Sequence, residues 1–160
     1  MKIKTCIVTG QYPPQVGGVG HSAHRVANIL ASRGLQVHVV ALQKHPTPLP
    51  FDESVVSTQE GEVLVHRVKV FHPKREAFAE GDVLTRYNRE MFHALEYFQQ
   101  RYHHDVLHAF FLYPAGFIAG LVGRLHGVKM IASIRGNDIG KYAFDPLRLP
   151  FIRSALENAD

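Results

Sequence analysis

The start of the chain, residues 2–34, changes from a strand-like to a helix-like hydrophobic pattern. Residues 3–8 form a short apolar, partly β-branched run of the kind that a buried parallel strand needs. From Val19 onward, apolar residues recur at helical spacing, and Gly34 ends the predicted helix as a C′ residue. Residues 37–42 then repeat the strand pattern. The sequence therefore predicts a βαβ unit with its glycines at the helix entrance.

The alternation of strand and helix patterns continues to the end of the chain. Residues 43–60 are rich in proline and carry few helix or strand signals, so we expect a long loop there. Residues 63–70 alternate well enough for a strand, with an edge position left open. Large apolar residues at helical spacing over 78–102 favour a core-facing helix over a binding face. The predicted strands are 3–8, 37–42, 63–70, 105–109 and 128–134, and the predicted helices are 19–33, 78–102, 113–126 and 147–159.

This order of elements predicts an α/β fold. Strands that alternate with helices form a Rossmann-like, doubly wound parallel sheet with helices on both faces. Right-handed crossovers and a reversal after the third predicted strand give the strand order 3-2-1-4-5. Such sheets bind ligands at the carboxyl ends of their strands, where the order reverses. We therefore expect the glycine loop at 10–20, His108 and the polar loop 135–138 to meet at one edge.

Three glycines, Gly17, Gly18 and Gly20, lie where the first predicted helix begins. A helix N-terminus offers unpaired N–H groups and a partial positive charge, and glycine lets a phosphate or a sugar hydroxyl approach the backbone. The loop is thus a candidate ligand site, although the same glycines would also serve a sharp turn alone. Residues 18–23 formally fit the dinucleotide fingerprint. That match is weak, because the preceding loop is too long and the next strand ends without an acidic residue.

Composition and charge narrow the class of protein. At 160 residues with a net charge of +4, the chain is the size of one soluble domain. Its basic residues are scattered, so we do not expect nucleic acid binding. The single cysteine, Cys6, lies in the first strand pattern and is expected to be buried, which fits a reducing compartment. Without a visible signal peptide or spanning segment, a cytoplasmic location is expected, with a peripheral membrane contact left open.

Three segments carry a family resemblance. They are the loop Tyr-Pro-Pro-Gln-Val-Gly-Gly-Val-Gly at 12–20, the strand Asp-Val-Leu-His-Ala at 105–109 and the segment Ser-Ile-Arg-Gly-Asn-Asp-Ile at 133–139. With them, the chain resembles the N-terminal half of a retaining glycosyltransferase of the GT-B fold, in the family of glycosyltransferases group one (family four). The likeness covers nearly the whole chain.

This resemblance implies a set of binding residues. Backbone N–H groups of the glycine loop would face the donor's diphosphate or the acceptor. The segment after the fifth predicted strand would face acceptor hydroxyls, although Arg135 stands where relatives often have a histidine, and Asn137 and Asp138 could equally form a turn and a cap. The implied residues are Gly17, Gly18 and Val19 for the donor diphosphate or acceptor, and His108, Arg135, Gly136, Asn137 and Asp138 for the acceptor.

The resemblance also implies what lies outside this sequence. Relatives carry a C-terminal domain that binds most of the nucleotide sugar and holds two spaced glutamates, a pattern that this chain lacks. We therefore expect residues 1–160 to form one acceptor-side domain with no catalytic residues of its own, inactive alone. The expected partners are a nucleotide-sugar donor, a sugar, glycan or lipid-linked acceptor, and the C-terminal domain. No metal or resident cofactor is expected, and the alternative is a binding or scaffolding module without catalysis.

Overall fold

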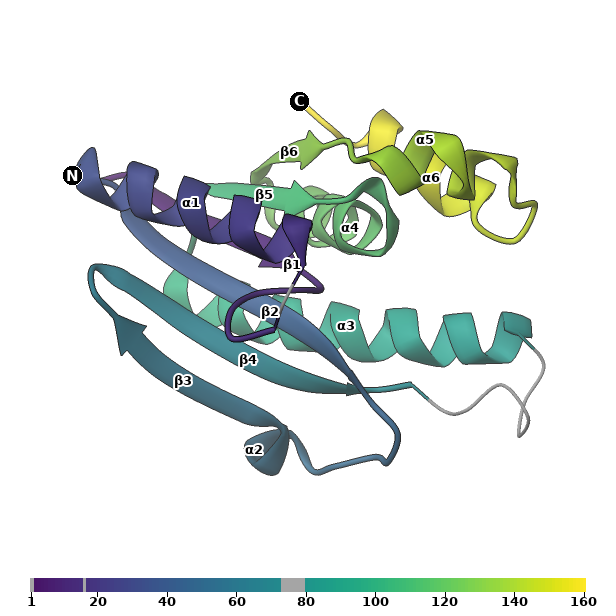
Figure 1. The fold of residues 1–160 in the computed structure, drawn as a ribbon, viewed down its shortest axis with the longest axis horizontal. Helices are drawn as coiled ribbons and strands as arrows, with labels where there is room; N and C mark the ends of the chain where they lie inside the picture. Colours follow the sequence, from purple (N-terminus) through teal and green to yellow (C-terminus); the bar gives the residue numbers. More distant parts are fainter. Residues whose placement is uncertain (1, 16, 73–79) are drawn as a thin grey trace.

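The protein folds around one six-stranded sheet with the order β3-β4-β2-β1-β5-β6 (Figure 1). The computed structural model describes residues 2–15, 17–72 and 80–160. The strands are β1 (Lys4–Thr9), β2 (Gln36–His45), β3 (Val55–Glu60), β4 (Val63–Phe71), β5 (Val106–Phe110) and β6 (Lys129–Ser133). The helices are α1 (Gly18–Ser32), α2 (Phe51–Ser54), α3 (Glu80–Tyr102), α4 (Phe117–His126), α5 (Gly136–Gly140) and α6 (Leu149–Glu157), with short turns η2 (Leu112–Gly116) and η3 (Tyr142–Phe144).

The predicted order 3-2-1-4-5 is found in the five parallel strands β4-β2-β1-β5-β6. The prediction of a wholly parallel sheet was wrong, because β3 adds an antiparallel strand beside β4 and takes the edge position from it. The expected loop at 43–60 was also wrong, since it contains the end of β2, helix α2 and β3. Strand β3 is exposed along most of its length, so it lacks the apolar alternation that reveals a half-buried strand.

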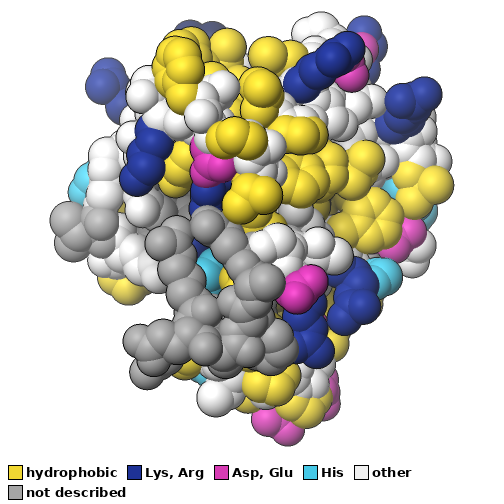
Figure 2. Space-filling model, turned by 90° about the vertical axis from the view of Figure 1, so that its right-hand side faces the viewer, with side chains coloured by type: hydrophobic (Ala, Val, Ile, Leu, Met, Phe, Trp, Pro, Cys, Tyr) yellow, Lys and Arg dark blue, Asp and Glu magenta, His cyan; other side chains and the backbone are white. Residues whose placement is uncertain are grey.

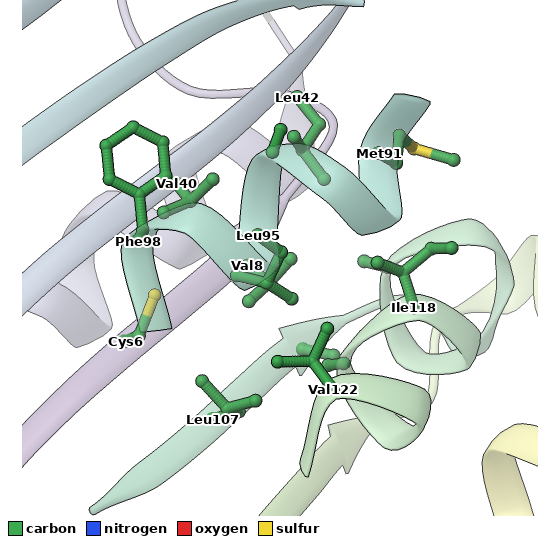
Figure 3. Close-up of a cluster of buried hydrophobic side chains, with 14 of the residues drawn as sticks. Cys6, Val8, Val40, Leu42, Met91, Leu95, Phe98, Leu107, Ile118 and Val122 are labelled. Carbon is green, nitrogen blue, oxygen red and sulfur yellow. The ribbon is translucent and has the colours of Figure 1, made fainter. Parts of the chain in front are cut away.

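Helices cover the two faces of the sheet with separate hydrophobic cores. Helix α1 packs on one face through its small residues Ala23, Ala27 and Ala31. Helices α3 and α4 cover the other face, where Leu95, Phe98 and neighbouring side chains meet the inner strands (Figure 3). The aromatic stripe of α3 is therefore core, as predicted. Cys6 belongs to the same core, and burial raises the pKa of its thiol to about 12, so it is a structural residue rather than a nucleophile.

Several element boundaries differ from the predicted ones near the end of the chain. The helix predicted at 113–126 begins at Phe117, because the chain first makes the tight turn η2. The polar loop predicted at 135–138 belongs to the short helix α5. Residues 78 and 79 of the helix predicted at 78–102 lie outside the described residues. Helix α3 is described from Glu80. Among the described helices, none has the length and apolar character needed to cross a membrane.

Candidate functional site

The candidate site lies at the carboxyl edge of the sheet, where the order of the parallel strands reverses, and Figure 2 shows the molecule from this side. Strands β1, β5 and β6 are parallel, so the segments that follow them emerge on the same side. The glycine loop precedes α1 there, η2 follows β5 and α5 follows β6 (Figure 1). The glycine loop and the segment after β6 therefore lie at the same edge of the sheet, whereas His108, predicted to join them, lies within β5.

The glycine loop contacts both α1 and β4. Tyr12 is buried against α1, with its ring centroid 5.6 Å from that of His24. Arg67 on β4 donates a hydrogen bond to the carbonyl oxygen of Pro13 and pairs with Glu60 at 2.7 Å. A Cβ on Gly20 would lie 3.3 Å from the backbone of Gln11 and Tyr12, so this glycine allows the loop to pack closely on α1. These contacts fix residues 11–13 of the loop against α1 and β4.

The first glycines of α1 remain accessible. Gly18 is exposed, and a Cβ built on it would meet no atom within 4 Å. A Cβ on Gly17 would meet only the end of the Gln11 side chain. No side chain caps this end of α1 among the described residues, and its first turn contains no acidic residue. The N–H groups of the first turn, including that of Val19, therefore face a region that an anion can approach.

Asp138 joins two of the segments at this edge. Its side chain is fully buried, and its carboxylate accepts hydrogen bonds from the backbone N–H groups of Leu112 (2.9 Å), Tyr113 (3.4 Å) and Arg135 (2.9 Å). The carboxylate thus caps α5 and ties it to η2. Of the two roles that the sequence left open for this residue, the structure shows the cap.

His108 and Arg135 both contact the ring of Phe110, on the side of the sheet that α1 covers. The His108 Nε2 lies 2.8 Å from the Ser133 hydroxyl oxygen. Its ring centroid lies 4.8 Å from that of Phe110, and the Arg135 guanidinium lies 4.8 Å from the same ring. Burial, reinforced by the charge of Arg135, lowers the pKa of His108. His108 is therefore neutral at neutral pH and available for hydrogen bonding rather than ion pairing.

A hollow of about 620 Å³ opens between these segments. Gly10 and Gln11 line it from the glycine loop and Asn137 from α5. The remaining wall consists largely of aromatic side chains from η2, η3, α3 and the end of β5, with one lysine from β2. These residues are Phe110, Phe111, Tyr113, Tyr142, Tyr87 and Lys44.

Only Asn137 among the predicted site residues lines this hollow. Gly17, Gly18 and Val19 lie on the glycine loop beside it, and Gly136 is exposed at the start of α5. His108 and Arg135 lie toward α1, and Asp138 is buried beneath η2. The sequence therefore predicted the loops at this edge but not the aromatic wall. The residues of the wall are far apart along the chain, and each has the pattern of an ordinary core position.

Phe111, which lines the hollow, has an unusual backbone conformation. Phe111 directly follows β5 and adopts a φ of 85°, a left-handed value that is rare for a bulky residue. It is held there by hydrogen bonds from its N–H to the Ser133 carbonyl (3.1 Å) and from the Gly116 N–H to its own carbonyl (2.9 Å). Such backbone strain is concentrated at functional sites in proteins. Its position in the wall of the hollow supports the assignment of the site.

Solved structures share this fold over most of the chain. Sucrose-phosphate synthase from Thermosynechococcus elongatus matches with 16% identity and a TM-score of 0.63, covering 99% of this chain and 41% of that one. The catalytic domain of starch synthase IV from Arabidopsis thaliana, bound to ADP and acarbose, matches with 12% identity and a TM-score of 0.55, covering 85% and 34%. A putative UDP-N-acetylglucosamine 2-epimerase from Listeria monocytogenes matches with 13% identity and a TM-score of 0.62, covering 100% and 38%.

At these identities, the structural likeness shows the fold alone. The chain spans about two fifths of the length of these proteins. No curated protein sequence matches the chain. The sheet order, the helices on both faces and the site at the carboxyl edge define an N-terminal domain of the GT-B fold. The sequence matches the Glycosyl transferase 4-like domain family over residues 17–160, and the chain belongs to that family.

Proposed function

We propose that this chain is the acceptor-binding domain of a nucleotide-sugar-dependent, retaining glycosyltransferase. The complete enzyme would transfer a sugar to a hydroxyl group of a glycan, lipid-linked or small-molecule acceptor. A C-terminal domain would supply most of the donor site, and the chain alone would be inactive, because transfer requires both walls of the cleft. Family membership and the ADP- and acarbose-bound starch synthase of the same fold support this class of ligand.

The observation that carries the proposal is the hollow at the carboxyl edge. Its size suits a small saccharide, and its wall combines flat aromatic surfaces with a few polar groups, as binding sites for small molecules do. The half-buried Phe111 and Tyr142 offer ring surface for the C–H face of a sugar, and the exposed Asn137 and Gln11 offer amides for hydroxyl groups.

The glycine loop would serve the charged part of the donor. The N–H groups of Gly18 and Val19 begin α1, where the helix dipole favours an anion such as a diphosphate. Arg135, Gly136 and His108 would assist on the α1 side of the same edge, where Arg135 can pair with a phosphate or carboxylate.

We expect Gly18→Val to weaken nucleotide-sugar binding by about ten-fold or more, because its side chain would occupy the space through which a diphosphate approaches the amides. The fold should be retained, since nothing lies within 4 Å of the new Cβ. The measurement is isothermal titration calorimetry of the full-length protein that carries this chain with UDP-glucose, ADP-glucose and GDP-mannose, and urea unfolding checks the fold. Gly81→Val on α3 is the matched control, because Gly81 is also exposed in the first turn of a helix with open space around it. Equal affinities in all three proteins would contradict the role of the loop.

Transfer itself is tested on the full-length gene product that carries this chain. A screen of nucleotide-sugar donors against saccharide acceptors should yield a product whose anomeric configuration matches that of the donor. Inversion of configuration would contradict the retaining mechanism. Saccharide binding without transfer from any donor would favour the binding-module alternative.

A further inference from the structure

Phe111 is a large apolar residue that lies outside the hydrophobic cores. Its neighbour Phe110 belongs to the core under α1, and its other neighbour Leu112 belongs to a cluster that includes Ile152 of α6. Among the described residues, Phe111 is neither a member of a core cluster nor a partly buried residue packed against one. It is half-buried and lines the hollow. Packing in a core therefore does not explain a phenylalanine at this position.

The backbone conformation does not favour a phenylalanine at position 111 either. Its φ of 85° and ψ of 143° lie close to a region that glycine occupies and that other residues avoid. The surrounding chain fixes this conformation. The N–H of Leu112 donates to the Asp138 carboxylate, and a Cβ on Gly116 would lie only 2.9 Å from the Phe111 carbonyl oxygen. The sequence thus has a bulky side chain where glycine would be less strained.

The positive φ changes the direction in which the chain leaves β5. Leu107 and Ala109 belong to the core under α3 and α4, whereas Phe110 belongs to the core under α1. Successive side chains of a strand alternate between the two faces, so a continued strand would place Phe111 on the same face as Ala109. Phe111 instead lines the hollow at the carboxyl edge. The strained conformation therefore keeps an aromatic residue out of the core and places it in the wall of the site.

We propose that Phe111 is a specificity-determining residue of the acceptor site, and that its ring stacks on the C–H face of a pyranose sugar. This inference rests on the proposed function and adds the residue that selects a ring-shaped acceptor. A flat aromatic ring gains contact and buried apolar surface only from a ligand that presents a flat apolar face. An acyclic polyol carries the same kinds of hydroxyl group without such a face, so it would form the hydrogen bonds without the stacking.

The experiment compares glucose, mannose and galactose with sorbitol, the acyclic counterpart of glucose, by amide NMR titration of the 160-residue chain. We expect at least one hexose to bind about five-fold or more tightly than sorbitol. Phe111→Leu keeps an apolar side chain without a flat face, so it should abolish this preference, whereas Phe111→Tyr should retain it. Phe51→Leu on α2 is the matched control, because Phe51 is exposed and does not line the hollow.

Urea unfolding of two further variants separates ligand binding from stability. Phe111→Gly and Phe111→Ala both lack the ring, so neither should prefer a hexose to sorbitol. Phe111→Gly should unfold at a higher urea concentration than Phe111→Ala, because glycine adopts a φ of 85° without strain from a Cβ. If Phe111→Gly unfolded at the lower concentration, the backbone at this position would not be strained and the inference would be overturned.

Each other outcome contradicts a different step. A hexose that binds the wild type and Phe111→Leu equally, with the same preference over sorbitol, would overturn the role of Phe111 and leave the proposed function standing. Equal binding of hexoses and sorbitol by the wild type would also overturn selection by the ring. A urea midpoint of Phe111→Leu as low as that of Phe98→Leu in the core would show that the ring is kept for packing. Failure of every hexose to bind the wild type would overturn both the inference and the proposed function.

Discussion

Asp138→Ala is expected to lower the free energy of unfolding by about 3 kcal/mol or more. The substitution removes the acceptor of three backbone N–H groups, those of Leu112 and Tyr113, which are buried, and that of Arg135, which is partly buried. Each buried donor left without a partner costs about 1–3 kcal/mol. The measurement is urea unfolding followed by circular dichroism. Asn137→Ala, at the exposed neighbouring position, should change stability by less than about 0.5 kcal/mol.

The same substitution should also damage the binding site. Asp138 holds η2 against α5, and both contribute to the wall of the hollow through Tyr113 and Asn137. Asp138→Asn should be intermediate in stability, because its amide keeps one acceptor oxygen but replaces the other with a donor that faces N–H groups. If Asp138→Ala unfolded at the same urea concentration as the wild type, the junction would not depend on this carboxylate.

The second large effect is expected to be a loss of stability in mild acid. His38, His66 and His104 form a cluster on the face of the sheet that α3 covers. The His104 Nε2 lies 3.1 Å from the His38 Nδ1, and the His104 Nδ1 lies 3.1 Å from the Gln99 Oε1. His66 stacks on Phe98, with centroids 4.3 Å apart, and bonds to the Ser57 hydroxyl at 2.7 Å. All three histidines are almost fully buried.

Burial is the main cause of the low basicity of these rings. It lowers the pKa of His104 to about 3 and that of His66 to about 4, and it also lowers the pKa of His38. Mutual repulsion within the cluster adds to the effect, together with nearby positive groups. The cluster is also faced by the charged or titratable groups of Lys4, Arg101, His103 and Tyr102, whose ring contacts all three histidines.

The sign of the pH dependence follows from these directions. In the unfolded chain, a histidine binds a proton near pH 6.5, whereas native His66 and His104 stay neutral until about pH 4 or below. The unfolded state therefore binds more protons as the pH falls from 6.5 to 4, and the free energy of unfolding decreases. Each such proton contributes about 1.4 kcal/mol per pH unit, so His66 and His104 together contribute up to about 3 kcal/mol per unit.

Urea unfolding at a series of pH values between 7 and 4 measures this slope. His66→Phe keeps the stacked ring without a titrating group, so it should flatten the slope by up to about 1.4 kcal/mol per pH unit. His21→Gln is the control, because His21 is exposed on α1. A slope that His66→Phe leaves unchanged would show that the cluster does not govern acid stability.

The fold was predictable wherever hydrophobic periodicity carried the information. The inner parallel strands are apolar runs buried on both faces of the sheet, and the long helix α3 buries one face, so their type and order followed from the sequence. Strand β3 escaped prediction because it is an exposed edge strand, defined by its pairing with β4 rather than by apolar positions. The secondary structure of such a segment is set by its pairing with a neighbouring strand and not by its local hydrophobic pattern.

The loops of the candidate site could be predicted from the sequence, but the aromatic residues that line the hollow could not. The sequence pointed to Gly18 and Asn137 because glycine and polar residues in loops that follow strands often bind ligands, although the same residues would also serve a turn. Lys44, Tyr87 and Tyr142 become neighbours only when β2, α3 and η3 meet at the carboxyl edge. In the sequence, Tyr87 belongs to a helical core stripe, and only the fold shows that its ring also faces the hollow.

Saccharide titration followed by amide NMR tests the central claim, that the hollow at the carboxyl edge binds the sugar. With glucose as the probe, chemical shifts should change at the amides of Gly10, Gln11, Tyr113 and Asn137, which line the hollow. Amides on the far end of α1, such as that of Ser32, should stay unchanged. Shifts confined to other surfaces, or no shifts at saturating sugar, would contradict the account.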